Sequence, residues 1–199
     1  MKSLTVMGLG NPGEEYEGTR HNTGWIIIDS IVGKSEDWKD KGGYTLCKTE
    51  DAHEKKAVAF TWVKPQTFMN KSGQAAGALI KSVKTAETLV VIHDDLDLPI
   101  GSAKLSFNRG SGGHRGVDSI IKAIKTEKFY RIRVGISPVT PTGKTKKPLG
   151  EAKVDKHILG EFSSKEMLEL KKLAKKLHEG LLALATQTPQ IATTIINSK

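Results

Sequence analysis

The stretch that most constrains this chain is Gly8 to Gly24, which reads GLGNPGEEYEGTRHNTG. It lies between a short apolar segment, Leu4–Leu9, and an isoleucine-rich segment, Trp25–Val32. Its glycines and its proline impose a backbone path that few other residues permit. The triplet R-H-N at the far end of the stretch adds His21, an imidazole that can act as a base, beside an arginine. This pattern predicts a hydrolytic centre that needs further side chains from elsewhere in the chain.

The chain has the size of a single domain. Its 199 residues are enough for a substantial core, so we expect one domain over residues 1–199. Cys47 is the only cysteine, which excludes an internal disulfide and is typical of a protein of the reducing cytoplasm. No apolar run approaches the roughly 20 residues that a membrane helix needs. No secretory leader is visible, because a strand-like segment follows Lys2 at once.

The charge of the chain indicates an acidic partner. The formal net charge is +9. An excess of this size is typical of proteins that bind RNA, DNA or an acidic membrane, but it also occurs on basic surfaces that bind nothing specific. The charge alone does not separate these alternatives.

Apolar segments of strand length alternate with segments of helical period, which predicts an α/β fold. We expect a single domain with a twisted, mixed but mostly parallel sheet flanked by helices, and an antiparallel edge from a hairpin at Pro99–Gly101. The expected strands are Leu4–Leu9, Tyr44–Thr49, Ala57–Val63, Thr88–Ile92, Ala103–Phe107 and Arg131–Ile136. The expected helices are Gly24–Ile31, Lys71–Val83, one with apolar residues at 117, 120, 121 and 124, and an amphipathic C-terminal helix near 163–185.

Local signals mark several boundaries. Asn22 and Thr23 are positioned to cap the first helix, and Gly33 to end it. Ser163 and Glu166 form the S-x-x-E capping box of the last helix, which carries a stripe of leucines at 170, 173, 177, 181 and 184. These leucines are needed to cover the sheet, so a membrane-surface role for the helix is disfavoured. A basic loop is expected near 138–148.

Gly8, Gly10 and Gly13 match the dinucleotide-binding pattern G-x-G-x-x-G, which is a weak signal by itself. In that pattern the third glycine lies within a helix whose N-terminus carries a pyrophosphate. Here Pro12 interrupts the pattern, and glutamates at 14, 15 and 17 would repel a pyrophosphate. The sequence therefore disfavours a dinucleotide-dependent dehydrogenase.

His21 alone has two interpretations, a base or a loop histidine that bonds backbone carbonyls. Asp94, at the end of a buried strand, favours the base, because a carboxylate that accepts from one imidazole nitrogen leaves the other free. Asp94 could also be a turn residue, since the run HDDLD at 93–97 has turn chemistry. The same run has the ligand types of a metal site, but no spaced partner set accompanies it, and we expect no metal.

Asn11 and Asn70 are candidates for holding a water or a carbonyl, although either could simply stabilise a turn. Together with Asp94 they follow strands of the expected sheet, and ligands of such sheets bind beyond the carboxyl ends of the strands. We therefore expect these side chains to converge on one crevice. No G-x-S-x-G motif is present and Cys47 lies within a strand, so water activated by His21 is simpler than a covalent nucleophile.

The segment Ser111–Gly116, SGGHRG, opens the third helix, so its backbone N–H groups form a terminus that favours anions. His114 and Arg115 could contact a phosphate there, or the segment could serve only as a loop that caps the helix. The lysines of the last helix are expected on its solvated face, opposite the leucines.

Five motifs, in this order and spacing, resemble those of bacterial-type peptidyl-tRNA hydrolases: GLGNPGEEYEGTRHNTG, KPQTFMNKSG, HDDLDLPIG, GSGGHRG and RIRVGI. A further segment, VDKHILGEF, resembles the one that precedes the last helix of that family. The likeness runs from about Leu4 to Leu184, and the ordered set is specific although each motif alone is modest. It implies a monomeric cytoplasmic α/β enzyme that hydrolyses the ester between a peptide and the 3′ ribose of tRNA, with no metal, cofactor or membrane.

The resemblance also implies roles for individual residues. The catalytic histidine of the family falls on His21, its aspartate on Asp94, and the asparagine of its N-P-G on Asn11. The strand arginine that binds a tRNA phosphate falls on Arg133, and Lys104 and Arg109 are expected beside it. The residues expected to contact the substrate are Tyr16, Phe68, Met69, Asn70, His114 and Arg115.

Two positions depart from the family pattern. Arg115 stands where the family usually has asparagine, and Ser106 stands where a basic residue is often paired with the phosphate-binding arginine. Lys104, Arg109 or Arg115 could compensate, so these departures concern the docking of tRNA and not the chemistry. The alternative from another class is a non-hydrolytic RNA-binding member of the same fold, like the chloroplast intron-splicing relatives, because such proteins keep much of the motif set.

Overall fold

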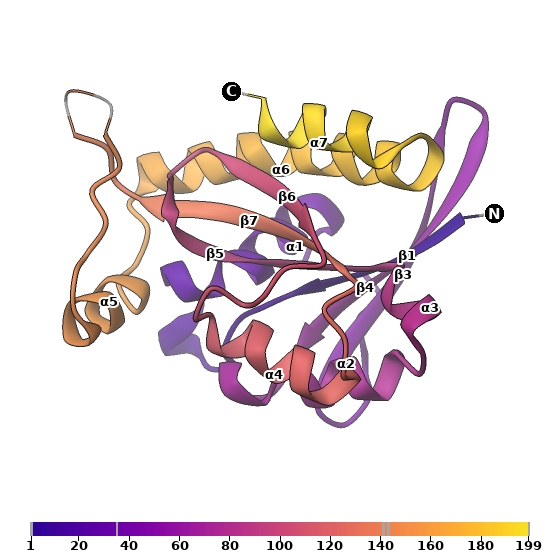
Figure 1. Cartoon of the computed structure of the whole chain (residues 1–199), viewed down its shortest axis with the longest axis horizontal. Helices are drawn as coiled ribbons and strands as arrows, with labels where there is room; N and C mark the ends of the chain where they lie inside the picture. Colours follow the sequence, from indigo (N-terminus) through magenta and orange to yellow (C-terminus); the bar gives the residue numbers. More distant parts are fainter. Residues whose placement is uncertain (1, 35, 141, 143, 199) are drawn as a thin grey trace.

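The computed structural model describes residues 2–34, 36–140, 142 and 144–198. Within these ranges the chain forms a seven-stranded sheet, in the order β2-β3-β4-β1-β5-β7-β6, with helices on both faces (Figure 1). The predicted α/β architecture with a mixed sheet is therefore confirmed. Among the described residues, none of the helices combines the length and the apolar character needed to cross a membrane.

The centre of the sheet is parallel. β1 (Lys2–Gly8) lies between β4 (Lys56–Pro65) and β5 (Leu89–Pro99), and β7 (Tyr130–Ser137) lies on the other side of β5. These four strands point the same way, so the loops that follow them leave from one edge of the sheet. The run HDDLD at 93–97 continues β5 and does not form the turn that the sequence left open.

The two edges of the sheet are antiparallel. β3 (Tyr44–His53) pairs with β4, and the short β2 (Lys39–Asp40) pairs with β3. On the other edge β6 (Ala103–Phe107) pairs with β7. The expected hairpin between β5 and β6 is wrong. β5 has β1 on one side and β7 on the other, so β6 pairs instead with the free side of β7.

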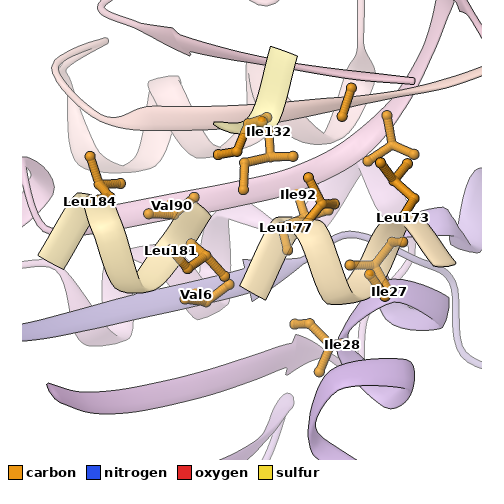
Figure 2. Packing of buried hydrophobic residues seen from close by; sticks show 14 of the residues in the cluster. Val6, Ile27, Ile28, Val90, Ile92, Ile132, Leu173, Leu177, Leu181 and Leu184 are labelled. Carbon is orange, nitrogen blue, oxygen red and sulfur yellow. The ribbon is translucent and has the colours of Figure 1, made fainter. Parts of the chain in front are cut away.

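One face of the sheet is covered by α1 (Thr23–Val32), α6 (Ser164–Thr186) and α7 (Pro189–Asn197). Figure 2 shows leucines of α6 over valine and isoleucine side chains of the sheet. The predicted stripe is confirmed, since all five of its leucines are buried. Full burial of one such side chain stabilises the fold by about 1.5–3 kcal/mol, so the stripe is a main attachment of α6.

The opposite face is covered by α2 (Gly73–Leu79) and α4 (Arg115–Ile124). A continuous helix over Lys71–Val83 is wrong. The segment begins with a 3₁₀ turn, η3 (Met69–Lys71), and after α2 the chain extends at Ile80, which is buried, before α3 (Val83–Ala86) begins. Ser82 starts α3 because its hydroxyl accepts from the N–H of Thr85, which is a local cap that favours a new helix.

The C-terminal part holds two helices that the sequence did not lead us to expect, α5 (Glu151–Ile158) and α7. Between them α6 begins as predicted, because the Ser163 hydroxyl accepts from the N–H of Glu166 and the Glu166 carboxylate accepts from the N–H of Ser163. The basic loop expected near 138–148 connects β7 to α5, and Val139 bridges Thr145 within it. Residues 141 and 143 of that loop lie outside the described residues.

The first turn of α1 lies directly on the sheet. A Cβ at Gly24 would overlap backbone atoms of Leu9 and Ile92, so a glycine is needed there. This close approach brings the 3₁₀ turn η2 (Arg20–Asn22), which precedes α1, against β5. Gly33 ends α1 as predicted, with a φ of 94°. The consequence for function is that residue 21 lies beside the carboxyl end of β5.

Candidate active site

A crevice of about 990 Å³ opens at the carboxyl ends of the parallel strands. Asn11 follows β1, Asn70 follows β4, and Asp94 lies in the last part of β5. All three line the crevice together with His21. The convergence expected from the topology is therefore found, although Asn70 stands exposed on the wall while the other three side chains are buried.

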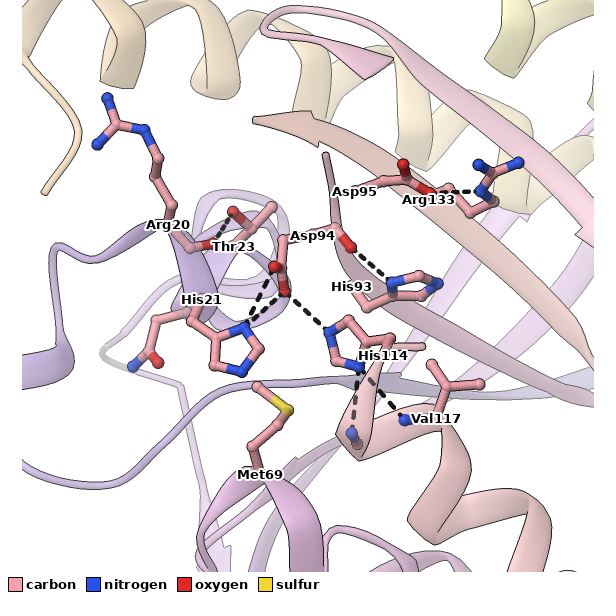
Figure 3. Close-up of polar contacts among 12 residues, drawn as sticks. Arg20, His21, Thr23, Met69, His93, Asp94, Asp95, His114, Val117 and Arg133 are labelled. Carbon is pink, nitrogen blue, oxygen red and sulfur yellow. Dashed lines mark hydrogen bonds and ion pairs between the residues drawn. The ribbon is translucent and has the colours of Figure 1, made fainter. Parts of the chain in front are cut away.

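Asp94 lies at the centre of a group of histidines (Figure 3). Its Oδ1 is 3.1 Å from Nδ1 of His21 and 3.0 Å from Nε2 of His114, and its Oδ2 is 3.2 Å from the same His21 nitrogen. Only 5% of Asp94 is exposed. One buried carboxylate thus holds two imidazoles.

The hydrogen bonds of His114 define its tautomer. Its Nδ1 accepts from the backbone N–H groups of Gly116 and Val117, at 3.2 and 3.3 Å, and so caps α4. Nε2 therefore carries the proton and donates it to Asp94. Because Asp94 also accepts from Nδ1 of His21, the second nitrogen of His21, Nε2, keeps its lone pair and is available as a base.

The charges of Asp94 and of the histidines around it shift the pKa values of these residues. Burial alone would raise the pKa of Asp94, but His21 and then His114 outweigh burial and hold that pKa well below its ordinary range. For His21 burial lowers the pKa, the Asp94 carboxylate raises it more, and the net result is a pKa above its ordinary value. Asp94 is thus ionised and favours the imidazolium form of His21.

His93 supports Asp94 from the other side. Its Nδ1 donates to the backbone carbonyl of Asp94 at 2.7 Å, and its ring lies edge-on to His114, with 4.6 Å between ring centres. Burial, and then the neighbouring His114, holds the pKa of His93 well below its ordinary value, so this ring stays neutral. Sequence reasoning gave His93 no part in orienting Asp94, and only its position directly before that aspartate could have indicated one.

His21, Asp94 and His114 have the ligand types of a metal site, and one ligand atom from each lies within 4.8 Å of the others. The capping bonds of His114 oppose such use. Its Nε2 carries the proton, and a protonated nitrogen has no lone pair for a cation. Ligation through Nε2 would require the proton to move to Nδ1, where two N–H groups already point.

Asn11 is held in place by Asn22 and Met69. Its N–H donates to the side-chain oxygen of Asn22, whose amide nitrogen donates to the Asn11 carbonyl, at 2.8 and 2.9 Å. The side-chain oxygen of Asn11 accepts from the N–H of Met69 at 2.8 Å. Asn22 occupies the N-cap position of α1, as predicted, but its side chain does not cap the helix, because it bonds Asn11 across the loop. These bonds leave the Nδ2 amide of Asn11 as a donor for a ligand oxygen.

Most of the predicted substrate contacts line the crevice, namely Phe68, Met69, Asn70, His114 and Arg115. Phe68 is 56% exposed, an unusual exposure for a large apolar side chain, whereas Met69 is buried. Tyr16 is not among the lining residues, but its ring meets that of Phe68 edge-on, with 6.5 Å between ring centres. Tyr16 thus supports the wall that Phe68 forms.

Arg115 lines the crevice and forms an ion pair with another of its lining residues. Its Nη2 is 3.1 Å from a carboxylate oxygen of Glu151, the first residue of α5, and both side chains are largely exposed. A second exposed ion pair, between Lys147 and Asp97, links the chain before α5 to β5. Sequence reasoning predicted neither ion pair, because the partners of exposed charges are set by tertiary structure.

Of the three predicted phosphate-binding residues, Arg109 and Arg133 line the crevice and Lys104 does not. Arg133 donates to the carboxylate of Asp95. Lys104 lies opposite Arg133 in the register of β6 and β7, whereas Ser106 lies opposite Arg131. Lys104 is therefore the cation of β6 that pairs with Arg133, and Ser106 adds no charge.

Arg131 is a residue that sequence reasoning missed. It is only 5% exposed, and its Nη2 donates to the carbonyl of Gly110 at 2.8 Å. It therefore holds the glycine-rich loop that leads to His114. The alternation of two arginines in RIRVGI, which places both on one face of β7, was the available signal.

The loop after β1 does not have the geometry of a dinucleotide site. Gly13 is followed by the 3₁₀ turn η1 (Glu14–Tyr16), then by η2, and a full helix begins only at Thr23. The loop therefore lacks the direct passage from strand to helix by which the dinucleotide pattern places a helix N-terminus at the pyrophosphate. The sequence argument against a dehydrogenase is confirmed.

A buried histidine bonded to a carboxylate, in a crevice at the carboxyl ends of a mixed sheet, is an arrangement typical of hydrolases. The family model described as peptidyl-tRNA hydrolase matches residues 5–199, so this chain belongs to that family. The resemblance of the five motifs is thereby confirmed.

Individual relatives agree with the family model. The chain is 39% identical over 197 residues to the peptidyl-tRNA hydrolase of Aquifex aeolicus, covering 96% of this chain and 95% of that one. It is 40% identical over 187 residues to the peptidyl-tRNA hydrolase of Coprothermobacter proteolyticus, covering 92% and 89%. The crystal structure of peptidyl-tRNA hydrolase from Acinetobacter baumannii superposes with a TM-score of 0.78 at 27% identity, covering 98% and 94%.

Proposed function

We propose that this chain hydrolyses the ester between a peptide and the 3′ ribose of tRNA, and that His21 activates the attacking water. Membership of the family supports the reaction and the substrate. The observation that carries the assignment of the base is the buried contact of 3.1 Å between Nδ1 of His21 and Asp94, since it leaves Nε2 of His21 as the free nitrogen in the crevice.

In this mechanism Nε2 of His21 takes a proton from a water while the water oxygen attacks the ester carbonyl carbon. The ionised Asp94 stabilises the imidazolium that forms. The tetrahedral intermediate then collapses, the bond between the carbonyl carbon and the 3′ oxygen breaks, and the imidazolium returns its proton to that oxygen. The products are the free peptide and tRNA with a 3′ hydroxyl.

The amides of the crevice serve the substrate and the oxyanion. The Nδ2 group of Asn11 donates to the attacking water or to the carbonyl, since its Oδ1 is already bonded to Met69. Asn70, on the facing wall, and N–H groups of the glycine-rich loop stabilise the developing negative charge. Phe68, backed by Tyr16, provides an apolar wall for the peptide side chains.

His114 acts through Asp94 in this scheme. Because the cap on α4 fixes its proton at Nε2, it always donates to Asp94 and cannot take the proton of His21 away. Held by this cap, His114 keeps the carboxylate of Asp94 oriented toward His21. We assign His114 to the positioning of Asp94 and to the crevice wall.

The RNA is held by the basic face of β6, β7 and the loop between β6 and α4. Lys104, Arg109 and Arg133 are its cations, and they bind phosphates of the tRNA backbone. The proposed enzyme works in the cytoplasm as a monomer without metal or cofactor. The tautomer of His114 supports the absence of a metal at the centre, and the single cysteine fits a reducing compartment.

The test of this function is the hydrolysis of diacetyl-lysyl-tRNA by the parent chain and by His21→Ala. General-base catalysis contributes about 10²–10⁴-fold, so we expect the variant to lose at least about that factor in turnover while it still binds tRNA. His53→Ala is the matched control, because His53 bonds Thr186 at the other end of the molecule. Cleavage by His21→Ala at the parental rate contradicts this role. A parent chain that binds tRNA and releases none would be a non-hydrolytic RNA-binding relative.

A further inference from the structure

Arg20 precedes His21 directly and has no part in the proposed chemistry. Its side chain is only 14% exposed, and it is not among the residues that line the crevice. Figure 3 shows its guanidinium on the opposite side of the turn from the His21 ring. A guanidinium this far removed from water needs partners that satisfy it, and these partners indicate what it does.

The partners of Arg20 all lie at the start of α6. Nη2 donates to both carboxylate oxygens of Glu166, each at 3.0 Å, and Nη1 donates to the backbone carbonyl of Glu161. The guanidinium carbon also lies 5.0 Å from the ring centre of Phe162, close enough for a cation–π contact. The side chain is thus held by an ion pair, a backbone acceptor and an aromatic ring at once.

The backbone repeats the same connection. The N–H of Arg20 donates to the carbonyl of Gly160, and the N–H of Phe162 donates to the carbonyl of Gly18, both at 3.0 Å. Between these bonds, Thr19 and Glu161 form an antiparallel bridge. Residues 18–20 and 160–162 are therefore joined by an isolated antiparallel bridge, and the Arg20 side chain extends this pairing to Glu166.

Glu166 is a rigid anchor for such a contact. Its carboxylate also accepts from the N–H of Ser163 at 2.7 Å and from the Ser163 hydroxyl at 2.9 Å, which caps α6. Burial would raise the pKa of Glu166, but the bonds from Ser163 and then Arg20 hold that pKa below its ordinary value. The anchor is therefore charged whenever the fold is intact near neutral pH.

We infer that Arg20 is a positioning residue, which clamps the turn η2 against the N-terminus of α6 and so keeps His21 within reach of Asp94. The turn needs this clamp because it is one 3₁₀ turn, and no side chain of the described residues caps its first residue. Its other supports are the backbone pairing with residues 160–162, the bond from the Thr23 hydroxyl to the Arg20 carbonyl, the Asn22–Asn11 pair and the His21–Asp94 bond itself. This inference rests on the proposed role of His21 as the base.

The test compares Arg20→Met with the parent chain. Methionine keeps much of the length of the side chain but has neither charge nor donors. A displacement of about 1 Å can cost about 10²-fold in rate, so we expect kcat to fall by about 10- to 100-fold with KM and tRNA affinity close to parental. Arg20→Lys should recover only part of the loss, because the single ammonium group of lysine cannot replace both Nη2 at Glu166 and Nη1 at the carbonyl of Glu161.

A second measurement is independent of activity. This measurement follows the NMR signal of the Nδ1 proton that His21 shares with Asp94. We expect this signal to be present in the parent chain and to be lost or exchange-broadened in Arg20→Met. Lys172→Met is the matched control, since it removes an exposed ion pair with Glu169 on the same helix and touches no part of the turn. It should change neither kcat nor the proton signal.

If Arg20→Met does not fold, Glu166→Gln decides the question, because glutamine keeps an oxygen for the cap of α6 and loses the charge that binds Arg20. A several-fold fall in kcat supports the clamp. The clamp is overturned if kcat and the His21 proton signal both stay at their parental values. It is also overturned if tRNA binding weakens while kcat is unchanged, because Arg20 would then be an RNA contact. A failure of the clamp can be told apart from a failure of the proposed role of His21. In the second case His21→Ala would cleave at the parental rate, whatever the effect of the Arg20 variants.

Discussion

At the scale of single residues, the carboxylate of Asp94 determines the state of its neighbours. It accepts from His21 and His114 within 3.1 Å, and His93 bonds its backbone carbonyl. The three histidines nevertheless differ, since His114 has its proton fixed by a helix cap and His93 is kept neutral by burial. His21 remains as the ring that can change its charge during a reaction.

This difference sets the dependence of the rate on pH. A base must be unprotonated, and the pKa of His21 is raised above its ordinary value, about 6.5. We therefore expect kcat/KM to increase with pH and to reach half of its maximum above that value. In Asp94→Asn the carboxylate that raises the pKa is lost while burial remains, so the midpoint should move below that of the parent chain and kcat should fall.

The measurement is a pH–rate profile of the parent chain and of Asp94→Asn, with the melting temperature of each recorded in parallel. Asp97→Asn is the control, because Asp97 lies on the same strand with its carboxylate largely exposed and paired with Lys147. An unchanged midpoint in Asp94→Asn contradicts the coupling of the two residues. Loss of folding in that variant would mark Asp94 as structural.

At the scale of elements, α7 shows how one helix completes the fold without contributing to the crevice. Its Ile196 is fully buried against Gly180 of α6, where a Cβ would overlap the isoleucine side chain. Its Asn197 accepts from the N–H of Leu105 and so covers part of the free edge of β6. An edge strand that is covered in this way has fewer unpaired groups to offer to another chain.

We expect Ile196→Ala to lower the free energy of unfolding by about 2–5 kcal/mol, which is the usual cost of emptying a buried isoleucine site. Urea unfolding measures this change. Ile191→Ala on the same helix is the control, because Ile191 is 43% exposed and its truncation leaves no cavity. The activity of Ile196→Ala at low temperature should persist, since α7 does not line the crevice. If Ile196→Ala lowers the free energy of unfolding no more than Ile191→Ala does, α7 is loosely attached.

At the scale of the whole molecule, some of the basic residues behind the net charge of +9 lie beside the crevice. The crevice separates α5, with its acidic Glu151 and Asp155, from the basic face of β6 and β7. A polyanion is therefore expected to approach over β6 and β7, with its 3′ end directed toward His21. The charge of the chain by itself gave no such direction.

We expect tRNA binding to weaken steeply with salt, because each phosphate neutralised by a cation releases counterions. Lys104→Ala should reduce the slope of log Kd against log salt by about one unit at most, with little change in kcat. Lys84→Ala, in α3 at the opposite end of the sheet, should leave the slope unchanged. Binding measured over a series of salt concentrations checks both, and a flat dependence in the parent chain contradicts the proposed face.

The sequence alone determined the features that depend on nearby residues. Period-2 and period-3.6 patterns indicated most strands and the leucine stripe of α6, and the capping box from Ser163 to Glu166 located the start of that helix. The pairing of His21 with Asp94 was also predicted, because a carboxylate that accepts from one imidazole nitrogen leaves the other nitrogen free as a base.

Only the tertiary structure decided the contacts between residues far apart in the chain. The split of the expected helix at Ile80, the pairing of β6 with β7 and the docking of α7 depend on which surfaces are free once the sheet is formed. The proton position on His114 and the clamp from Arg20 to Glu166, 146 residues away, depend on the same packing. Local patterns set elements within a few residues, whereas long-range partners are chosen by the geometry of the packed elements.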